Sequence, residues 1–247
     1  MDKIFITGTS SGLGFALSQI LSTKTRHVIG FSRTKSDFTG EFHTCDFTKP
    51  QLAESILKDA FNAADLDNAK RITFVHNAGQ LGPLDLIQNF DHTDIQQNIT
   101  ANLIGSAIAL STFTKAVAHL AVPKLFINIS SGAAFDDRAK AGWSLYCASK
   151  AGQAQLVRAV AIEQETAPHP ITLINFNPGV METGMQRLIR ATPENAFPDV
   201  QRFIQLKEEG RVPEPTTIAQ HLVRAILHPE NLENAKSYHY ADFEPLT

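Results

Sequence analysis

The sequence predicts a three-layer α/β fold, in which helices cover both faces of one parallel sheet. Two observations predict it. Strand-like runs rich in Ile, Val and Phe alternate along the chain with longer segments of helical period, as in repeated βαβ units. A glycine-rich turn joins the first of these runs to the first helical segment, where such a unit must turn tightly. The whole pattern is that of a doubly wound sheet, the Rossmann fold.

Seven strands are expected, separated by helices, at residues 3–7, 27–32, 41–44, 72–76, 124–130, 171–177 and 237–241. Two helical stretches, 93–120 and 144–167, are rich in small side chains such as Ala101, Gly105 and Ala154, which let helices approach closely. These helices either face a second copy of the chain or pack on the sheet, and both interpretations stay open.

One domain is expected to span residues 1–247, because 43% hydrophobic and 19% charged residues suffice for one core and give no sign of disorder. Between about residues 185 and 215 the alternation stops, and a mixed polar and apolar insertion follows a strand end. Ligands of open α/β sheets bind at the carboxyl ends of strands, so we expect this insertion to cover the site.

Composition narrows the class of function. A net charge of −3 provides no basic footprint for nucleic acid or an anionic membrane. The N-terminus lacks the regions of a signal peptide, and no apolar run reaches membrane-spanning length, so we expect a soluble, cytoplasmic protein that acts on small molecules. The two cysteines, Cys45 and Cys147, sit in no metal-ligand cluster and are expected to be reduced packing residues.

The turn after the first strand reads Thr-Gly-Thr-Ser-Ser-Gly-Leu-Gly from Thr7 to Gly14. Glycine here lets the backbone approach a pyrophosphate, which then sits against the positive end of the following helix. The position of the turn between strand and helix predicts a dinucleotide site. Its expected contacts are Gly8, Ser10, Ser11, Gly12, Leu13 and Gly14.

Tyr146 and Lys150 stand four residues apart in a helical stretch, so they project from one face. A phenol with an ordinary pKa of about 10 is a poor base, but a neighbouring ammonium favours its ionised form and eases proton exchange with a substrate oxygen. Such a pair can also be a solvated helix face. The other motifs along the chain favour the catalytic interpretation.

The Thr-Gly-x-x-x-Gly-x-Gly spacing of the turn resembles the short-chain dehydrogenase/reductase family, and further motifs follow in the family's order. Residues 76–79 read His-Asn-Ala-Gly and resemble its Asn-Asn-Ala-Gly. The resemblance implies that Asn77, Ala78 and Gly79 stabilise the sheet and border the adenosine side of the cofactor. His76 departs from the pattern and is expected to be a buried residue at a strand end.

Two more segments carry implied cofactor contacts. Asp46 and Phe47 resemble the family's adenine contact, with Asp46 accepting from the exocyclic amine, although a cap or turn role for this carboxylate stays open. The segment with Pro178, Gly179, Val180 and Thr183 resembles the one that brackets the nicotinamide. There Val180 would contact the carboxamide through its backbone, and Thr183 would reach the amide or the phosphates.

The end of the second strand favours NADP(H) over NAD. No carboxylate stands at its tip, whereas Arg33 offers a planar fork of donors suited to a 2′-phosphate and Ser32 a hydroxyl. Lys35 is a possible auxiliary cation, and Asp37 is expected on the loop surface. The family's other basic determinant, just before the second glycine of the turn, is absent because Ser11 stands there.

The resemblance implies a catalytic set of Ser131, Tyr146, Lys150 and Asn102. Ser131 ends the fifth strand two residues further from Tyr146 than in the family, where Ala133 stands at the usual spacing. We align by the strand end and assign the difference to a loop insertion at residues 135–138.

The roles of these residues follow from chemistry. Ser131 would polarise a ketone, and Tyr146 would donate the proton while a hydride arrives from the nicotinamide. Lys150 would hold the ribose and, together with the charge of the cofactor, lower the pKa of Tyr146. Asn102 resembles the family's Asn at a helix kink, whose backbone carbonyl holds a water beside the Lys, although the role of a simple polar residue within a helix stays open.

Within the family, residues 142–151 and scattered later segments look most like sepiapterin reductases and bacterial benzil reductases. The substrates of these enzymes, a pterin with a diketone side chain and benzil, both contain adjacent carbonyls. The expected substrate is therefore a vicinal diketone. In sepiapterin reductases a carboxylate near the C-terminus anchors the pterin, and Asp242 stands at that place, either in this role or as an exposed tail acid. Trp143 and Met185 are expected to line an apolar wall beside the carbonyl, or to be packing residues.

Two other functions stay open. A 3-oxoacyl-carrier-protein reductase would favour a basic patch near the pocket; none is evident in the sequence of the insertion, although folding can assemble one. A non-catalytic NADP-sensing protein would keep the fold and lose the chemistry, yet such proteins commonly lack Tyr or Lys, and both are present here. The expected partners are a small carbonyl substrate and further copies of the chain, in a homodimer or homotetramer.

Overall fold

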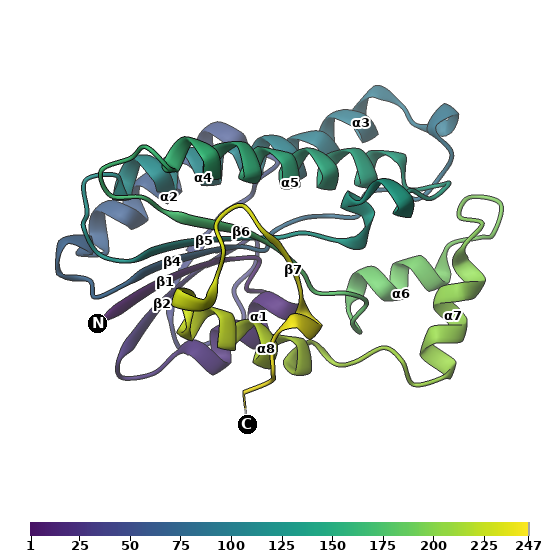
Figure 1. Ribbon diagram of the computed structural model, residues 1–247. Coiled ribbons are helices and arrows are strands. Elements are labelled where there is room, and N and C mark those ends of the chain that lie inside the picture. The colour runs from purple at the N-terminus through teal and green to yellow at the C-terminus, as the bar shows by residue number, and fades with distance from the viewer. Residues whose placement is uncertain (247) are drawn as a thin grey trace.

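The chain folds around a seven-stranded parallel sheet in the order β3-β2-β1-β4-β5-β6-β7 (Figure 1). The computed structural model describes residues 1–246, apart from the side chain of Asp136. The strands are β1 (Asp2–Thr7), β2 (Arg26–Ser32), β3 (Glu41–Thr44), β4 (Ile72–His76), β5 (Lys124–Ile129), β6 (Thr172–Asn177) and β7 (Ser237–His239). The predicted doubly wound α/β fold is thereby confirmed.

Helices cover both faces of the sheet. In Figure 1, α2, α4 and α5 lie above it and α1 and α8 lie below, and each group encloses its own apolar cluster against the strands. The helices are α1 (Gly12–Leu21), α2 (Pro50–Ala63), α3 (His92–Ile99), α4 (Gly105–Val117), α5 (Ser144–Gln164), α6 (Gly184–Ala191), α7 (Val200–Glu208) and α8 (Pro215–Leu227). Among residues 1–246, no helix combines the length and the apolar character that crossing a membrane requires.

The central strands are apolar along almost their whole length because both of their faces are covered. Phe5 of β1, Phe74 of β4 and Phe126 of β5 occupy matching positions of neighbouring strands. Their rings stack with centroids 6.4 Å apart for Phe5 and Phe74 and 5.4 Å apart for Phe74 and Phe126. This buried row of rings fixes the register of the three strands that carry the site.

The sheet reverses its winding between β1 and β4, which are hydrogen-bonded neighbours although β2, β3 and α2 separate them in sequence. The connections from these two strands leave in opposite directions, so a crevice opens at their carboxyl ends. The glycine-rich turn follows β1, and the segment Asn77 to Gly79 follows β4.

Several predicted element boundaries need correction. The stretch 93–120 is not one uniform α-helix, because α3 and α4 are joined by a π-helical turn at Thr100–Ile104. The second long helix ends at Gln164, three residues earlier than expected, and the last strand ends at His239 instead of residue 241. Tyr240–Asp242 form a 3-10 turn instead.

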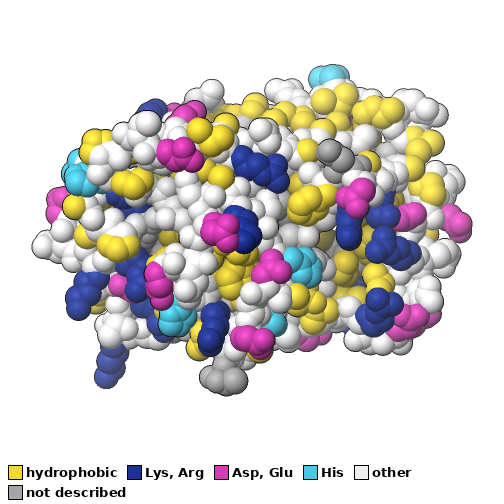
Figure 2. Space-filling view, in the orientation of Figure 1, with side chains coloured by type: hydrophobic (Ala, Val, Ile, Leu, Met, Phe, Trp, Pro, Cys, Tyr) yellow, Lys and Arg dark blue, Asp and Glu magenta, His cyan; other side chains and the backbone are white. Residues whose placement is uncertain are grey.

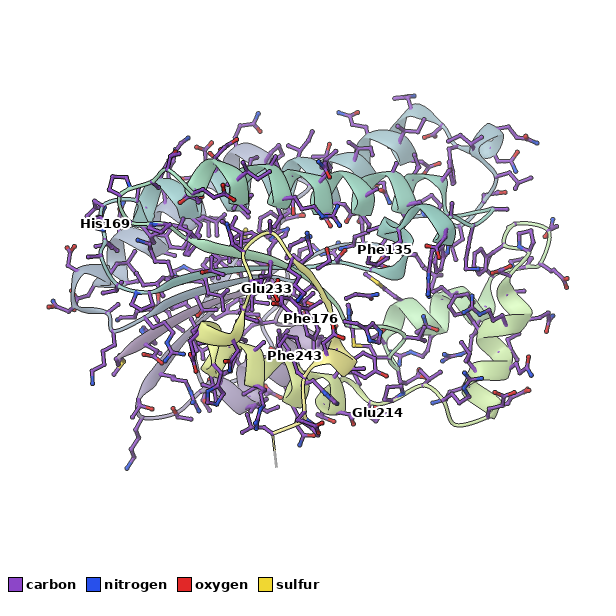
Figure 3. All side chains as sticks on the ribbon, in the orientation of Figure 1. Phe135, His169, Phe176, Glu214, Glu233 and Phe243 are labelled. Carbon is purple, nitrogen blue, oxygen red and sulfur yellow. The ribbon has the colours of Figure 1, made fainter. Side chains whose placement is uncertain are left out.

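The C-terminal segment is held on the sheet by aromatic packing. The ring of Phe243 stacks on Phe176 of β6 at 6.1 Å (Figure 3). It also lies 5.2 Å from the ring of Tyr238 of β7. The chain after the short last strand therefore stays close to the carboxyl edge of the sheet.

The insertion forms two helices, α6 and α7, which project beyond the sheet on the right of Figure 1. A third apolar cluster joins them to the main body, where the ring of Trp143 stacks on Phe197 at 5.1 Å and meets Phe203 at 5.6 Å. The carboxylate of Glu182 ties both helices together through Arg190 of α6 at 2.8 Å and Lys207 of α7 at 3.0 Å.

His76 ends β4 as a buried residue, as expected, with 1% of its surface exposed. The Thr7 hydroxyl accepts hydrogen bonds from the backbone amides of Asn77 (3.0 Å) and Ala78 (2.8 Å), so its own proton is free for Nδ1 of His76 at 3.3 Å. Nε2 then carries the ring proton and has no partner among the described groups. Burial first, and the charge of Lys150 second, lower the pKa of His76 to about 3.

We expect acid to destabilise the protein through His76. Between its ordinary pKa of 6.5 and about 3, the unfolded chain takes up a proton at this ring and the folded protein does not, so unfolding becomes more favourable as the pH falls. Urea unfolding followed by circular dichroism should show that His76→Asn loses less stability than the wild type between pH 7 and pH 4. Parallel pH dependences of the two proteins would contradict this origin.

Candidate active site

Two adjoining cavities lie at the carboxyl edge of the sheet. One, of about 270 Å³, is formed around the turn after β1 and is called the glycine-turn cavity. The other, of about 360 Å³, contains Tyr146 and is called the tyrosine cavity. They share the lining residues Asn77, Gly79, Met181, Thr183 and Met185. Shared walls make the two cavities one continuous groove.

The glycine turn provides a cradle for a group that approaches the backbone closely. Gly8 and Gly12 have φ values of +76° and +57°, which only glycine adopts without strain, and a Cβ on Gly8 would lie 2.6 Å from Nδ2 of Asn77. The N-cap residue of α1, Ser11, makes no side-chain hydrogen bond to the helix. The first amides of α1 therefore remain available to an anion.

Most of the predicted dinucleotide contacts line this cavity: Gly8, Ser10, Ser11, Gly12, Leu13, Ser32, Arg33, Asp46, Phe47, Asn77, Ala78, Gly79 and Thr183. Gly14 lies behind the turn, packed against the carbonyl of Gly8, where a Cβ would clash. The shape of the turn and the character of its lining fit a dinucleotide.

Two polar residues of this cavity, Asp46 and Ser32, also have local roles. The Asp46 carboxylate accepts from the amide of Thr48 at 3.0 Å and from its hydroxyl at 2.8 Å, so the turn role left open by the sequence is present. The Ser32 hydroxyl donates to the carbonyl of Thr34 at 2.6 Å and has no second proton to donate. Arg33 is exposed at the cavity wall.

The tyrosine cavity brings Ser131, Tyr146 and Lys150 together. Ser131 follows β5, whereas Tyr146 and Lys150 come from one face of α5, as their spacing predicts. Both side chains are buried, with 8% and 5% exposed. Nζ of Lys150 donates to the carbonyl of Ile129 at 2.9 Å and lies 6.0 Å from the centre of the Tyr146 ring.

Burial changes the pKa values of both Tyr146 and Lys150. Removal from water raises the pKa of Tyr146, and a hydrogen bond with the Ser131 hydroxyl acts in the opposite direction. In the protein alone burial dominates the Tyr146 pKa, and the lowering expected from Lys150 together with the charge of the cofactor stays a prediction. Burial also lowers the pKa of the Lys150 ammonium to about 8.

The structure separates Ser131 from Ala133 as candidates for the hydroxyl position. Both residues line the tyrosine cavity, but Ala133 is a buried member of the apolar cluster around Trp143 and has no hydroxyl, whereas the Ser131 hydroxyl interacts with Tyr146. Two 3-10 turns, Gly132–Ala134 and Asp136–Arg138, take up the extra residues between β5 and α5. The amide of Ala133 donates to the Ser131 hydroxyl oxygen at 3.2 Å and orients it.

Asn102 lies in the π-helical turn, fully buried, which agrees with the kink that the resemblance implied. Its side chain bridges to Gln80, accepting from the backbone amide and donating to the carbonyl, both at 2.8 Å. Its backbone carbonyl, expected to hold a water, accepts a hydrogen bond from Nε2 of Gln153 at 2.6 Å.

Sequence reasoning missed Gln153. Gln153 is three residues beyond Lys150 on the same face of α5, and its side chain is fully buried. A glutamine on the buried face of this helix, in register with Lys150, was the available signal.

The predicted substrate residues divide into two groups. Trp143 and Met185 line the tyrosine cavity, together with Pro178, Gly179 and Val180. Asp242 does not line it: this exposed carboxylate accepts from the backbone amide of His239 at 2.7 Å and caps the 3-10 turn. The structure therefore does not bring Asp242 to the other site residues.

Four further cations line the tyrosine cavity, and sequence reasoning missed them: Arg138, Lys140, Arg202 and Arg211. They come from the loop before α5, from α7 and from the segment after α7. No single stretch of the sequence is strongly basic, so only folding assembles this group.

Comparison with known proteins agrees with this geometry. The chain is similar to a benzil reductase ((S)-benzoin forming) of Bacillus subtilis, 33% identical over 246 residues that cover 98% of this chain and 100% of that protein. It is 29% identical to the sepiapterin reductase of Rattus norvegicus over 166 residues, 64% of this chain and 58% of that protein.

A solved short-chain dehydrogenase/reductase of Saccharomyces cerevisiae has the same fold, with a TM-score of 0.85 at 22% identity, over 99% of this chain and 100% of that one. The family model described as short chain dehydrogenase matches residues 2–194. With the glycine turn after β1 and the Tyr146–Lys150 pair on α5, these matches establish that the chain belongs to the short-chain dehydrogenase/reductase family.

Proposed function

We propose that this protein is an NADPH-dependent carbonyl reductase that converts one ketone of a vicinal dicarbonyl compound into an alcohol. The observation that carries the proposal is that the Tyr146 and Ser131 hydroxyls and the Lys150 ammonium line one cavity, which adjoins the cavity around the glycine turn. Family membership supports the oxidoreductase class, and the full-length similarity to a benzil reductase supports the type of substrate.

NADPH, when bound, supplies the hydride that reduces the ketone. In the proposal, the amides at the start of α1 hold the pyrophosphate, and the guanidinium of Arg33 holds the 2′-phosphate. Lys150 holds the nicotinamide ribose. Val180 and Thr183, which line the tyrosine cavity, position the nicotinamide end.

Tyr146 is the proposed proton donor. Because burial raises its pKa, the phenol stays protonated at neutral pH and has a proton to give to the carbonyl oxygen. Ser131 accepts from the Ala133 amide, so its own proton can point to the same oxygen and stabilise the charge that develops there. Lys150 is the buried cation nearest to Tyr146 and is placed to return a proton.

The proposed water site at Asn102 competes with hydrogen bonds within the chain. The backbone carbonyl of Asn102 accepts from Nε2 of Gln153 and from the backbone amide of Gly105, so in the proposal a water beside Lys150 takes the place of one of these donors.

The cavity favours a diketone such as benzil over a pterin. Its wall beside Tyr146 is apolar, with Trp143, Met185 and Phe203. A guanidine-like pterin edge needs a carboxylate, and no described residue that lines this cavity carries one, since Asp242 caps the 3-10 turn.

A second candidate is a 3-oxoacyl-carrier-protein reductase. The cations Arg138, Lys140, Arg202 and Arg211, assembled at the cavity, are the specific observation that favours it, because an acidic carrier protein needs a basic surface. The third candidate function is a non-catalytic NADP-sensing protein. The presence of both Tyr146 and Lys150 argues against it, because such proteins commonly lack one of these residues.

A cytoplasmic location and a homo-oligomer remain part of the proposal. Ile104 in the π-helical turn and Ile162 on α5 are 43% and 60% exposed, which supports contact with a second copy through these helices.

Turnover with a substrate panel tests the function. We expect NADPH oxidation with benzil and other vicinal diketones, and less with sepiapterin or an acetoacetyl thioester. Activity on the thioester alone would favour a 3-oxoacyl-carrier-protein reductase. No activity on any carbonyl compound would favour a non-catalytic NADP-sensing protein.

Tyr146→Phe should lower the rate of diketone reduction by at least about 100-fold, because general acid catalysis contributes this much or more. NADPH binding, measured by fluorescence titration, should stay nearly intact, since the ring is kept. Tyr238→Phe, which removes a hydroxyl that bonds only to the amide of Glu233 outside the cavity, is the matched control. Substantial turnover in Tyr146→Phe would remove this residue as the acid.

Arg33→Ala should raise the KM for NADPH about tenfold or more, the usual loss for hydrogen bonds to a charged group, and should leave the KM for NADH little changed. Steady-state kinetics with both dinucleotides measures this difference. Lys35→Ala is the control, because Lys35 is exposed and lies outside the lining of both cavities. Equal losses with NADPH and NADH would refute the 2′-phosphate contact.

The value of kcat/KM for reduction should be constant below pH 8 and fall above it, because the Lys150 ammonium, with its pKa lowered to about 8, loses its proton there. Tyr146, with its raised pKa, keeps its proton in this range. In Lys150→Arg the guanidinium stays charged, so the fall in the residual activity should move to higher pH. A fall at the same pH in this variant would assign it to another group.

A further inference from the structure

We propose that the substrate is an anionic dicarbonyl compound, with a carboxylate at the end remote from the reacting ketone, held by Arg202 and Arg138 in the tyrosine cavity. The inference rests on the proposed function and deepens it, because it concerns the other end of the same site. Neither arginine belongs to the family motifs of the chain.

The charge of the cavity wall is the first observation. The described residues that line the tyrosine cavity include five Lys and Arg side chains and no Asp or Glu. Three of these five cations already have a role. Lys150 belongs to the proposed catalytic set. Lys140 forms an ion pair with Asp199, and Arg211 forms one with Glu209 at 3.0 Å. No ion pair of Arg138 or Arg202 occurs among the described side chains. Both side chains are exposed at the cavity wall, where an anionic ligand would provide the opposite charge that they lack among the described side chains.

The position of Arg202 is the second observation. It stands on α7 directly before Phe203, whose ring lies 5.6 Å from Trp143, and Trp143 in turn lies edge to face with Tyr146 at 5.8 Å. The wall thus runs from the proton donor through two aromatic rings to a guanidinium. A flat aryl dicarbonyl matches the rings, and a carboxylate at its far end matches the planar fork of donors on arginine.

The phosphates of the dinucleotide do not account for these arginines. Arg33 is the cation in the lining of the glycine-turn cavity, whereas Arg138 and Arg202 line the tyrosine cavity alone. A pocket with walls of one sign raises the local concentration of an oppositely charged substrate and its rate of association.

A small anion fits better than an acidic protein surface. Figure 2 shows Lys and Arg side chains on the right, over α6 and α7, with acidic side chains beside them. Glu182 pairs with Arg187, Arg190 and Lys207, and its single charge offsets one of these three cations. Arg202 and Arg138, for which no ion pair occurs among the described side chains, line the tyrosine cavity together with Trp143, where a small substrate can reach them.

Three matched substrates test the proposal: benzil, 4-carboxybenzil and 4-carbamoylbenzil, assayed with NADPH. The last two have the same shape and differ in charge. We expect kcat/KM for the carboxylate to exceed that for the carboxamide about tenfold or more, the usual gain from hydrogen bonds to a charged group. Added KCl should reduce the preference, because salt screens exposed charges.

Arg202→Gln and Arg138→Gln should each reduce this preference, and the double variant should abolish it while benzil reduction persists. Arg187→Gln, which removes the same charge from an exposed residue of α6 outside both cavity linings, should keep it. Equal kcat/KM for the carboxylate and the carboxamide, or a preference that survives the double variant, would overturn the proposal and leave the proposed function standing.

A binding experiment separates this outcome from failure of the proposed function. Trp143 is the only tryptophan in the chain and lines the cavity, so its fluorescence reports occupancy in the NADP-saturated protein. Benzoate should quench it at lower concentration than benzamide, and Arg202→Gln should remove the difference. If no dicarbonyl is reduced, the proposed function fails, and this titration still decides on the anion site.

Equal quenching by benzoate and benzamide would overturn the anion site. An arginine-dependent preference for a thioester on an acidic carrier protein, without any preference for the free carboxylate, would also overturn it and assign the cations to carrier docking.

Discussion

The site depends on one group of hydrogen bonds between the ends of β1 and β4. The Thr7 hydroxyl accepts hydrogen bonds from the backbone amides of Asn77 and Ala78. In return, the Asn77 side chain donates to the carbonyls of Thr7 and Gly8 at 3.1 and 3.3 Å. These bonds satisfy backbone groups just where two strands diverge and cannot pair further. They also hold the glycine turn against the strand that leads to the tyrosine cavity, so both halves of the groove share one anchor.

The residues that the sequence predicted well follow directly from strand ends or from one helix face. The glycine turn and the pair Tyr146 and Lys150 needed only the position of β1 and the period of α5. Asp242 and the direction of the Tyr146 pKa needed information that sequence spacing lacks: the shape of a 3-10 turn and the depth of burial. Arg202 was missed because folding alone brings α7 to the cavity.

Burial sets the chemistry of the site as much as charge does. Removed from water, Tyr146 keeps its proton more firmly, and Lys150 gives its proton up more easily. The two shifts move the pKa values of these neighbouring groups apart, since Tyr146 is raised from 10.0 and Lys150 is lowered from 10.5 to about 8. Lys150 is therefore the stronger acid of the two, so passing a proton from its ammonium to an ionised Tyr146 is favourable. The buried amides of Asn102 and Gln153 surround this pair with neutral hydrogen-bonding groups and add no further charge.

Glu182 and Thr183 are consecutive residues with different tasks. Glu182 holds α6 and α7 together through its ion pairs. Thr183 lines both cavities. Any ligand that contacts Thr183 restrains backbone that is continuous with the ion pairs of α6 and α7, and these helices form part of the wall of the tyrosine cavity. Occupation of one cavity is therefore coupled to the shape of the other.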